Sequence, residues 1–246
     1  MAKPWQVLDN ADTEEGRLEL RQRGEKDFLI TIDNRVLMTS TANRSEQSLA
    51  ELACRAMRNQ TDPRVLIGGL GMGYTLKAAL DNLPAEAKVV VAELNPVVLQ
   101  WCAGPIAHLT DGAVNDPRVT VEIADVSTLI TAAAMGGDAG RFDAIILDLY
   151  EGPHEEAAEY DHLYGDAALE LSGTALRPGG VFAIWSEDPD KTFERRLTDA
   201  RFSFTKERPG RGGRRHVVYI AKRLATGASR KPLPGPSGRR HGRKKP

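Results

Sequence analysis

The chain has 246 residues, of which 41% are hydrophobic and 27% charged, and its formal net charge is −1 at pH 7. This composition is typical of a globular protein and is neither that of a disordered chain nor that of a membrane protein. No run approaches the roughly 20 apolar residues needed to cross a bilayer, and the polar N-terminus lacks the apolar core of a signal peptide. Cys54 and Cys102 form no close pair, so we expect a cytoplasmic protein with neither a disulfide framework nor a zinc motif.

Residues 1–60 are expected to form a small β-domain followed by a helix. Short runs at 17–21, 28–32 and 36–39 predict strands, and Asp33-Asn34 is a hairpin turn signal between the last two. Ser45 is a candidate N-cap, and apolar residues at helical spacing after it predict a helix over 45–58.

From residue 61 to residue 223, short apolar runs alternate with helical patterns. Helices are expected over 74–82 and from Pro96, where proline suits the first turn. Parallel strands buried on both faces are predicted at 65–67, 88–92, 119–123, 144–147 and 181–185, the last fed by a turn at 177–180. The runs 202–205 and 216–220 flank the glycine-rich segment 209–213 and predict a closing hairpin. We therefore expect an α/β fold with a doubly wound, mostly parallel sheet and an antiparallel edge.

The C-terminal segment is strongly basic. Residues 224–246 contain seven Lys or Arg residues and no acid, so removing them from the total of −1 leaves −8 on the first 223 residues. Glycine, proline and serine fill the rest of this tail, a composition that cannot bury a core. We expect a disordered, solvated tail, and contact between this tail and a nucleic acid is the alternative.

A glycine loop follows the first parallel strand, with Gly69, Gly71 and Gly73 at alternate positions. Glycine lets the backbone turn tightly and approach a ligand, and the next helix presents free N–H groups. Glu93 ends the second strand, twenty residues past Gly73, where an acid accepts hydrogen bonds from a ribose diol. Asp125 ends the third strand, where it would meet an adenine edge or, alternatively, cap the next helix. Together these residues predict a nucleoside site.

Residues after the loop narrow the class of nucleoside. A dinucleotide fingerprint needs a glycine where Tyr74 stands, and no Gly-Lys-Ser or Gly-Lys-Thr follows to bind a triphosphate. The glycine spacing and the closing hairpin are more similar to the architecture of S-adenosylmethionine-dependent transferases.

Several segments resemble the spermidine synthase family of polyamine aminopropyltransferases. They lie at 31–36, 65–71, 90–96, 116–119, 142–148 and 176–180, and the pair Glu93-Leu94-Asn95-Pro96 and Asp116-Pro117-Arg118-Val119 is the most specific of them. The resemblance implies a small N-terminal β-domain, a homodimer, and transfer of an aminopropyl group from decarboxylated S-adenosylmethionine to an amine. It also implies that Glu93 holds the ribose and Asp125 the adenine, and that Asp148 is catalytic with Glu151 as the next acid of its loop.

Two positions depart from the pattern of that family. Its glycine loop carries an acid that holds the free amine of the cofactor, and Met72 stands at this position. Its tyrosine–histidine pair falls on Arg44-Ser45. A methyltransferase that uses S-adenosylmethionine itself is therefore an alternative, and a non-catalytic binding protein with the same fold is another.

The segment after Asp148 is acidic. Between Arg141 and Arg177 there are nine acids and no lysine or arginine, and the acids nearest Asp148 are Glu151, Glu155, Glu156, Glu159 and Asp161. Such an acidic lip would attract a small cationic amine, although a solvated acidic helix is the alternative. His154 and His162 match no metal-binding spacing, so we expect no metal and consider His154 a candidate proton relay.

Overall fold

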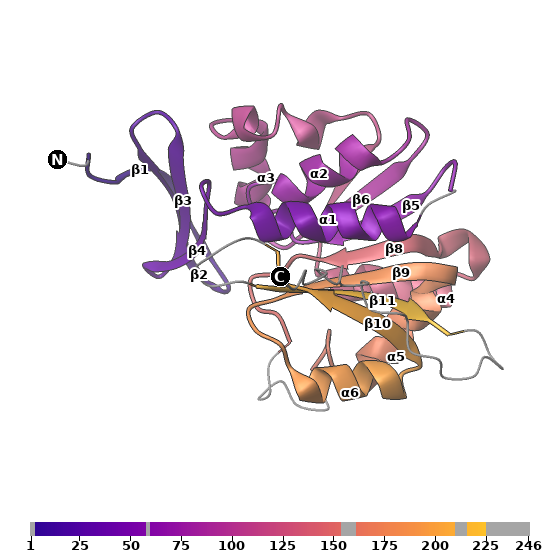
Figure 1. The fold of residues 1–246 in the computed structure, drawn as a ribbon. Helices are drawn as coiled ribbons and strands as arrows, with labels where there is room; N and C mark the ends of the chain where they lie inside the picture. Colours follow the sequence, from indigo (N-terminus) through magenta and orange to yellow (C-terminus); the bar gives the residue numbers. More distant parts are fainter. Residues whose placement is uncertain (1–2, 58–59, 154–160, 210–215, 225–246) are drawn as a thin grey trace, which may run out of the picture.

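The computed structural model of the chain describes residues 3–57, 60–153, 161–209 and 216–224 (Figure 1). Several predictions fall outside these residues. They concern the tail from residue 225 onward, most of the glycine-rich hairpin segment, the proposed relay His154, and the lip acids Glu155, Glu156 and Glu159.

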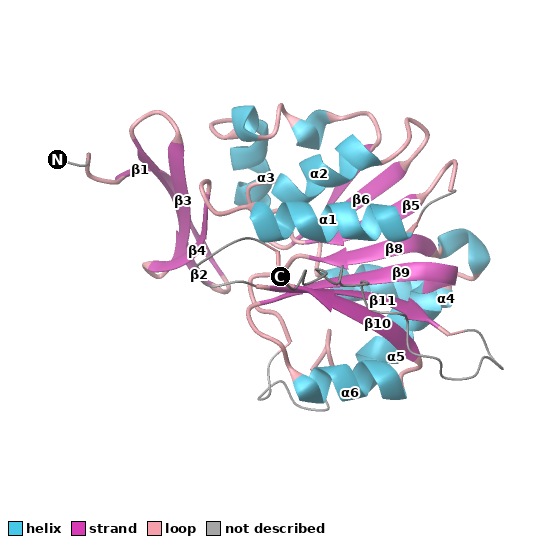
Figure 2. Cartoon of the chain, viewed as in Figure 1, coloured by secondary structure: helices cyan, strands magenta, loops and turns pink. Residues whose placement is uncertain are grey.

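The N-terminal part of the chain forms a four-stranded antiparallel sheet in the order β1-β2-β3-β4 (Figure 2). Its strands are β1 (Gln6–Thr13), β2 (Gly16–Arg23), β3 (Asp27–Ile32) and β4 (Arg35–Thr39). Asp33 and Asn34 connect β3 to β4 with φ angles of 46° and 64°. A two-residue hairpin turn whose central residues are both left-handed follows the natural twist of the strands, so the predicted turn is confirmed.

The main sheet has seven strands in the order β10-β11-β9-β8-β5-β6-β7. Strands β9, β8, β5, β6 and β7 are parallel, whereas β11 is antiparallel to both β9 and β10. The strands are β5 (Arg64–Gly68), β6 (Lys88–Glu93), β7 (Val119–Ile123), β8 (Phe142–Leu147), β9 (Leu176–Ser186), β10 (Phe202–Glu207) and β11 (Val217–Arg223). The predicted doubly wound, mostly parallel sheet with an antiparallel edge is confirmed.

Strand β9 begins at Leu176, which is earlier than predicted. The expected turn at 177–180 lies inside the strand, at the point where the register against β8 shifts between Phe142 and Ala144. Gly179 has a φ of 79° there, which glycine adopts readily in a turn. Between the pairs Phe142–Leu176 and Ala144–Val181, β9 has three more residues than β8, so the predicted turn interrupts the pairing within a longer strand.

Three helices cover each face of the main sheet (Figure 1). One layer contains α1 (Arg44–Ala56), α2 (Tyr74–Asn82) and α3 (Pro96–Ala103), and the other contains α4 (Val126–Met135), α5 (Asp166–Ala175) and α6 (Lys191–Asp199). Short 3₁₀ helices lie at Ala107–Leu109, Ala113–Asn115 and Asp138–Gly140. Val65 and Ile67 pack with the first layer and Leu66 with the second. Because both faces are covered, the strands read as continuous apolar runs.

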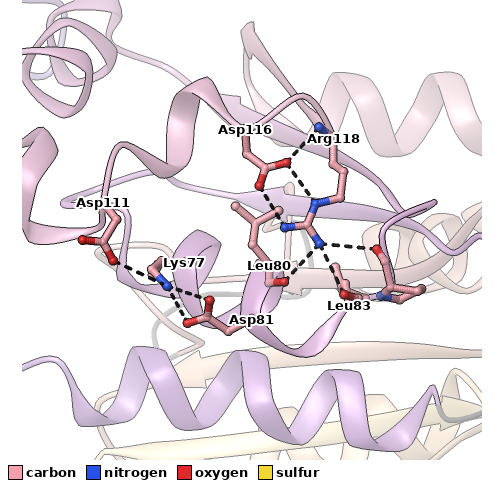
Figure 3. Close-up of polar contacts among 8 residues, drawn as sticks. Lys77, Leu80, Asp81, Leu83, Asp111, Asp116 and Arg118 are labelled. Atoms are coloured by element: carbon pink, nitrogen blue, oxygen red, sulfur yellow. Dashed lines mark hydrogen bonds and ion pairs between the residues drawn. The ribbon is translucent and has the colours of Figure 1, made fainter.

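Arg118 closes the C-terminal end of α2 (Figure 3). Its guanidinium donates to the backbone carbonyls of Leu80, Leu83 and Pro84 at 3.1–3.3 Å, and it binds both oxygens of Asp116 at 2.8–2.9 Å. The pKa of Asp116 is lowered to about 2 by these hydrogen bonds. A cation at the end of a helix is favoured by the unpaired carbonyls. This motif therefore stabilises the turn from α2 into β6.

Cys54 and Cys102 are both buried and free. Burial raises the pKa of each thiol to about 12, and Cys102 Sγ donates to the carbonyl of Gly71 at 3.2 Å. Within the described residues, no helix has the length and apolar character needed to cross a membrane.

Candidate active site

The carboxyl ends of β5 and β8 lie side by side where the strand order of the sheet reverses. Strands β6 and β7 extend the sheet on one side of β5, and β8 and β9 extend it on the other. The backbone N–H of Asp148 donates to the carbonyl of Gly68 at 2.9 Å, and the N–H of Gly69 donates to the carbonyl of Ala92 at 2.9 Å. Ligands of open parallel sheets bind at this kind of switch point.

A cavity of about 500 Å³ opens at this edge. The N-terminal sheet supplies an apolar wall, formed by Leu18, Ile30, Ile32, Leu37 and Met38. Carboxylates surround the rest of the cavity, from Glu15, Glu46, Glu93, Asp125, Asp148 and Glu151, while Arg35 and His162 are the basic residues among the described lining. An apolar wall facing several carboxylates suits a ligand with an aliphatic body and a positive charge.

Six of the seven predicted site residues line this cavity: Gly69, Gly71, Glu93, Asp125, Asp148 and Glu151. Gly73 lies outside the lining. It is the N-cap of α2, with a φ of 82°, and its N–H donates to the carbonyl of Leu70 at 2.8 Å. Its place in the structure is therefore the turn that starts α2.

A side chain at Gly69 or Gly71 would collide with neighbouring parts of the protein. Both have left-handed φ angles, 87° and 53°. A Cβ atom at Gly69 would collide with the backbone oxygen of Asp148, and one at Gly71 would lie 2.8 Å from Met38 Sδ. Glycine at these two positions therefore lets the loop pack closely against Asp148 and Met38 at the edge of the cavity.

Glu93 is buried at the end of β6, with 7% of its surface exposed. Its two oxygens accept from the backbone N–H groups of Leu70 at 3.0 Å and Asn95 at 2.8 Å. Burial raises the pKa of Glu93, and these N–H groups oppose the increase. The carboxylate thus braces the glycine loop, and each of its oxygens keeps a further lone pair for a ligand hydroxyl.

Asp125 has the capping role and also faces the cavity. One oxygen accepts from the N–H of Ser127 at 2.8 Å, so Asp125 is the N-cap of α4. The other oxygen lies 3.6 Å from Nε2 of His162. With 40% of its side chain exposed, Asp125 can still accept a hydrogen bond from a ligand.

Asp148 follows β8 and lies beside the glycine loop. Its pKa is raised to about 7, first by burial and second by the nearby charge of Glu46. The hydroxyl of Thr75, in the first turn of α2, donates to Asp148 Oδ2 and opposes this increase. An acid of this pKa is partly ionised at neutral pH and can accept a proton there.

Glu151 lies on the exposed side of the cavity, in the same loop as Tyr150. The guanidinium of Arg35 is stacked over the ring of Tyr150, 4.6 Å from its centroid. The backbone carbonyl of Glu151 accepts from the hydroxyl of Tyr164 at 3.3 Å. This loop is thus held by contacts from β4 and from the segment before α5.

The residues that sequence reasoning missed come from the N-terminal half of the chain and from α2. Glu15, Arg35, Glu46 and Thr75 reach the site or its acids only through tertiary packing. Glu46 had one signal in the sequence, because it directly follows Arg44-Ser45, the position of the tyrosine–histidine pair in the resembling family.

Met72 is fully buried in the core and does not line the cavity. The position of the family's loop acid is therefore apolar and turned away from the site. Among the residues that the structure describes, no three His, Cys, Asp or Glu side chains form a cluster able to hold a metal ion.

The spermine/spermidine synthase domain matches residues 47–197 of this chain. Putrescine N-methyltransferase 4 of Nicotiana tabacum is 34% identical over 126 residues, which are 50% of this chain and 30% of that protein. A polyamine aminopropyltransferase of Mycobacterium tuberculosis (strain CDC 1551 / Oshkosh) is 30% identical over 128 residues, which are 52% of this chain and 23% of that protein. The matched segment thus spans less than a third of either relative.

Solved structures show the same fold. Spermidine synthase from Thermotoga maritima superposes with a TM-score of 0.70 at 19% identity, over 89% of this chain and 73% of that one. Human methyltransferase-like protein 13, in complex with SAH, gives a TM-score of 0.53 at 18% identity, over 78% of this chain and 84% of that one. The predicted methyltransferase-like fold with an N-terminal β-sheet is confirmed.

Proposed function

Because the chain belongs to the spermine/spermidine synthase family, we propose that it transfers an aminopropyl group from decarboxylated S-adenosylmethionine to a small cationic amine. The observation that carries the proposal is the single cavity that holds both the glycine loop with Glu93 and the titratable carboxylate of Asp148. The part of the cavity beside the glycine loop and Glu93 suits a nucleoside, and the part beside Asp148 suits a protonated amine.

The nucleoside would lie along the carboxyl ends of β5, β6 and β7. Gly69 and Gly71 line this part of the cavity. Glu93 and Asp125 line this part of the cavity; Glu93 would accept hydrogen bonds from the ribose, and Asp125 would accept one from the adenine. Both carboxylates are fixed by backbone N–H groups, so their acceptor atoms are oriented before the ligand arrives.

Asp148 would prepare the amine. A bound sulfonium supplies an alkyl carbon with a good leaving group, so the protein need not activate the donor further. The acceptor amine is protonated at neutral pH, since a lysine-like ammonium has a pKa near 10. Asp148 binds this ammonium, takes a proton from it, and leaves the nitrogen lone pair free to attack. The pKa of Asp148 is raised to about 7. It is therefore closer to the pKa of the amine than the pKa of an ordinary carboxylate is, which favours the proton transfer.

The surrounding acids would bring the amine to the site. Glu151, Glu15 and Glu46 line the cavity with Asp148, and such a concentration of one charge raises the local concentration of cations. The apolar wall of the N-terminal sheet would pack against the methylene groups of the acceptor. This part of the proposal predicts a preference for aliphatic amines with more than one positive charge.

Methyl transfer from S-adenosylmethionine is the second candidate. It is favoured by the buried, apolar Met72, which leaves the glycine loop without an acid to hold the amine of a decarboxylated donor. The match to a putrescine N-methyltransferase is compatible with this reading. In either case we expect a homodimer that acts in the cytoplasm without a metal ion, as the family resemblance implies.

The experiment identifies the nucleoside product. Purified protein is incubated with each donor and a panel of diamines and polyamines, and the products are separated by chromatography. Methylthioadenosine establishes aminopropyl transfer, and S-adenosylhomocysteine establishes methyl transfer. If neither forms although methylthioadenosine binds in calorimetry, the protein is a binding protein. If no nucleoside binds, the proposed function is wrong.

A further inference from the structure

A chain of hydrogen bonds leads from β11 to the cavity. His216, directly before β11, has Nδ1 3.1 Å from the hydroxyl oxygen of Ser45 at the start of α1. That hydroxyl donates to Oε2 of Glu46 at 2.6 Å. Glu46 lines the cavity, and its charge raises the pKa of Asp148. Residues far apart in the sequence therefore meet at the amine end of the site.

The direction of this chain follows from the hydrogens available. Ser45 has a single hydroxyl hydrogen, and an ionised Glu46 only accepts, so this hydrogen goes to Glu46. Nδ1 of His216 must then donate to the oxygen of Ser45, which requires a hydrogen on Nδ1. The ring of His216 is also held edge-to-face against Trp185, with centroids 4.7 Å apart. Ser45 is buried, so the contact is shielded from water.

Other groups around Glu46 leave its carboxylate facing the cavity. From α2, Thr75 lies between the two acids, because its hydroxyl is within reach of the backbone oxygen of Glu46 and of Asp148 Oδ2. Burial raises the pKa of Tyr74, and the negative charge of Glu46 contributes to the increase. The hydroxyl of Tyr74 donates to the carbonyl of Ser40 at 3.1 Å and not to Glu46. Among the described residues, no lysine or arginine forms an ion pair with Glu46 or Asp148.

Glu46 and Asp148 line the same cavity, and two carboxylates without a basic partner among the described residues can bind a cation. We propose that Glu46 provides a second carboxylate of the amine site beside Asp148, and that His216 positions it through Ser45. The inference rests on the proposed function, since it assigns a further residue to the amine acceptor. One ammonium held between the two acids compensates their mutual repulsion, and Asp148 remains the proton acceptor.

The first test replaces Glu46 by Gln. We expect the KM for 1,4-diaminobutane to rise about tenfold or more, the usual effect of losing a charge-assisted hydrogen bond. The acidic limb of the kcat/KM profile should move to lower pH, because Asp148 loses a neighbouring negative charge. The matched control is Glu51→Gln, on the exposed side of the same helix, which should leave both quantities unchanged.

The second test separates positioning from packing. His216→Leu removes the donor to Ser45, so the KM for the diamine should rise several-fold, together with a smaller shift of the pH profile. His216→Asn keeps an N–H donor near the position of Nδ1, and it should restore values close to those of the parent. Melting temperatures of all variants show whether each one is folded.

Diamine binding measured by calorimetry, with methylthioadenosine present, distinguishes the failures. If the parent turns over but Glu46→Gln matches it in KM, pH profile and diamine affinity, the inference is wrong and the proposed function stands. If the parent gives no product but binds the diamine in a Glu46-dependent way, the amine site stands and the transfer reaction is wrong. If the parent neither turns over nor binds the diamine, both are wrong.

Discussion

The position of a side chain at Gly69 is already taken by the backbone oxygen of Asp148. Neither group can move freely, since one belongs to the turn after β5 and the other ends β8. We therefore expect Gly69→Ala to destabilise the protein by about 3 kcal/mol or more and to reduce nucleoside binding. The control is Gly24→Ala, which has a similar φ of 66° but no neighbour within 4 Å. Gly24→Ala should lower the free energy of unfolding by only about 1 kcal/mol. If urea unfolding shows equal losses of stability in the two variants, the collision at Gly69 is not what destabilises the protein.

Glu93→Ala should weaken methylthioadenosine binding tenfold to a hundredfold, as expected for a lost carboxylate acceptor. It should also lower the free energy of unfolding by about 1–3 kcal/mol, because the N–H groups of Leu70 and Asn95 lose their acceptors. Glu122→Ala, at an exposed acid of β7, is the control. Calorimetry that finds parental affinity in Glu93→Ala would show that the ribose lies elsewhere.

Asp148→Asn should make the protein more stable at pH 8 by up to about 4 kcal/mol. The folded-state pKa of about 7 is above that of an unfolded aspartate, so the folded parent binds more protons between about pH 4 and pH 7. The parent thus loses stability as the pH rises through this range, whereas asparagine does not titrate. The difference should vanish near pH 4, and Asp138→Asn, at a 94% exposed side chain, should show no such trend.

In the proposed reaction, Asp148→Asn should also keep the affinity for methylthioadenosine and lower turnover by about 10²–10⁴-fold. The amide preserves the shape of the side chain and accepts the hydrogen bond from Thr75, but it cannot take the amine proton. Single-turnover kinetics with a saturating amine measures this step directly. A rate equal to that of the parent would remove Asp148 from the mechanism.

Arg118→Leu should lower the free energy of unfolding by about 1–3 kcal/mol and leave nucleoside affinity unchanged. The carbonyls of Leu80, Leu83 and Pro84, in the last turn of α2 and just after it, would lose their donor, while the cavity does not include Arg118. Lys77→Met is the matched control, since Lys77 pairs with Asp81 at 2.6 Å on the surface nearby (Figure 3). That exposed pair should contribute less than about 1 kcal/mol. A weaker nucleoside affinity in Arg118→Leu would contradict a purely structural role.

Much of the main sheet could be predicted because its strands are buried on both faces. The segments 65–67 of β5, 89–92 of β6 and 144–147 of β8 are apolar, and such runs have few alternatives in an α/β chain. Strand β1 was missed because it lies at the edge of the N-terminal sheet, and most of its residues are exposed. Its sequence shows no alternation, since pairing with β2 rather than burial determines its conformation.

The site residues that could be predicted from the sequence are those that lie at or just after the ends of parallel strands. Glu93 ends β6, and Asp125 and Asp148 closely follow the ends of β7 and β8; the topology brings such positions to one edge. Glu46 and Arg35 depend instead on how α1 and the N-terminal sheet pack against that edge, and His216 meets Ser45 only because β11 pairs with β9. Contacts of this kind have no local signature in the sequence.

Burial of Cys54 and Cys102 also has a practical consequence. With a pKa of about 12, roughly one thiol in 10⁵ is ionised at pH 7, and only the thiolate reacts readily. A cysteine introduced on the surface would therefore react with a maleimide or a spin label much faster than Cys54 or Cys102. The two native cysteines need not be replaced first. Labels at Glu25→Cys, in the turn between β2 and β3, and at Met135→Cys, at the end of α4, would report the separation of the N-terminal sheet from α4 as ligands enter.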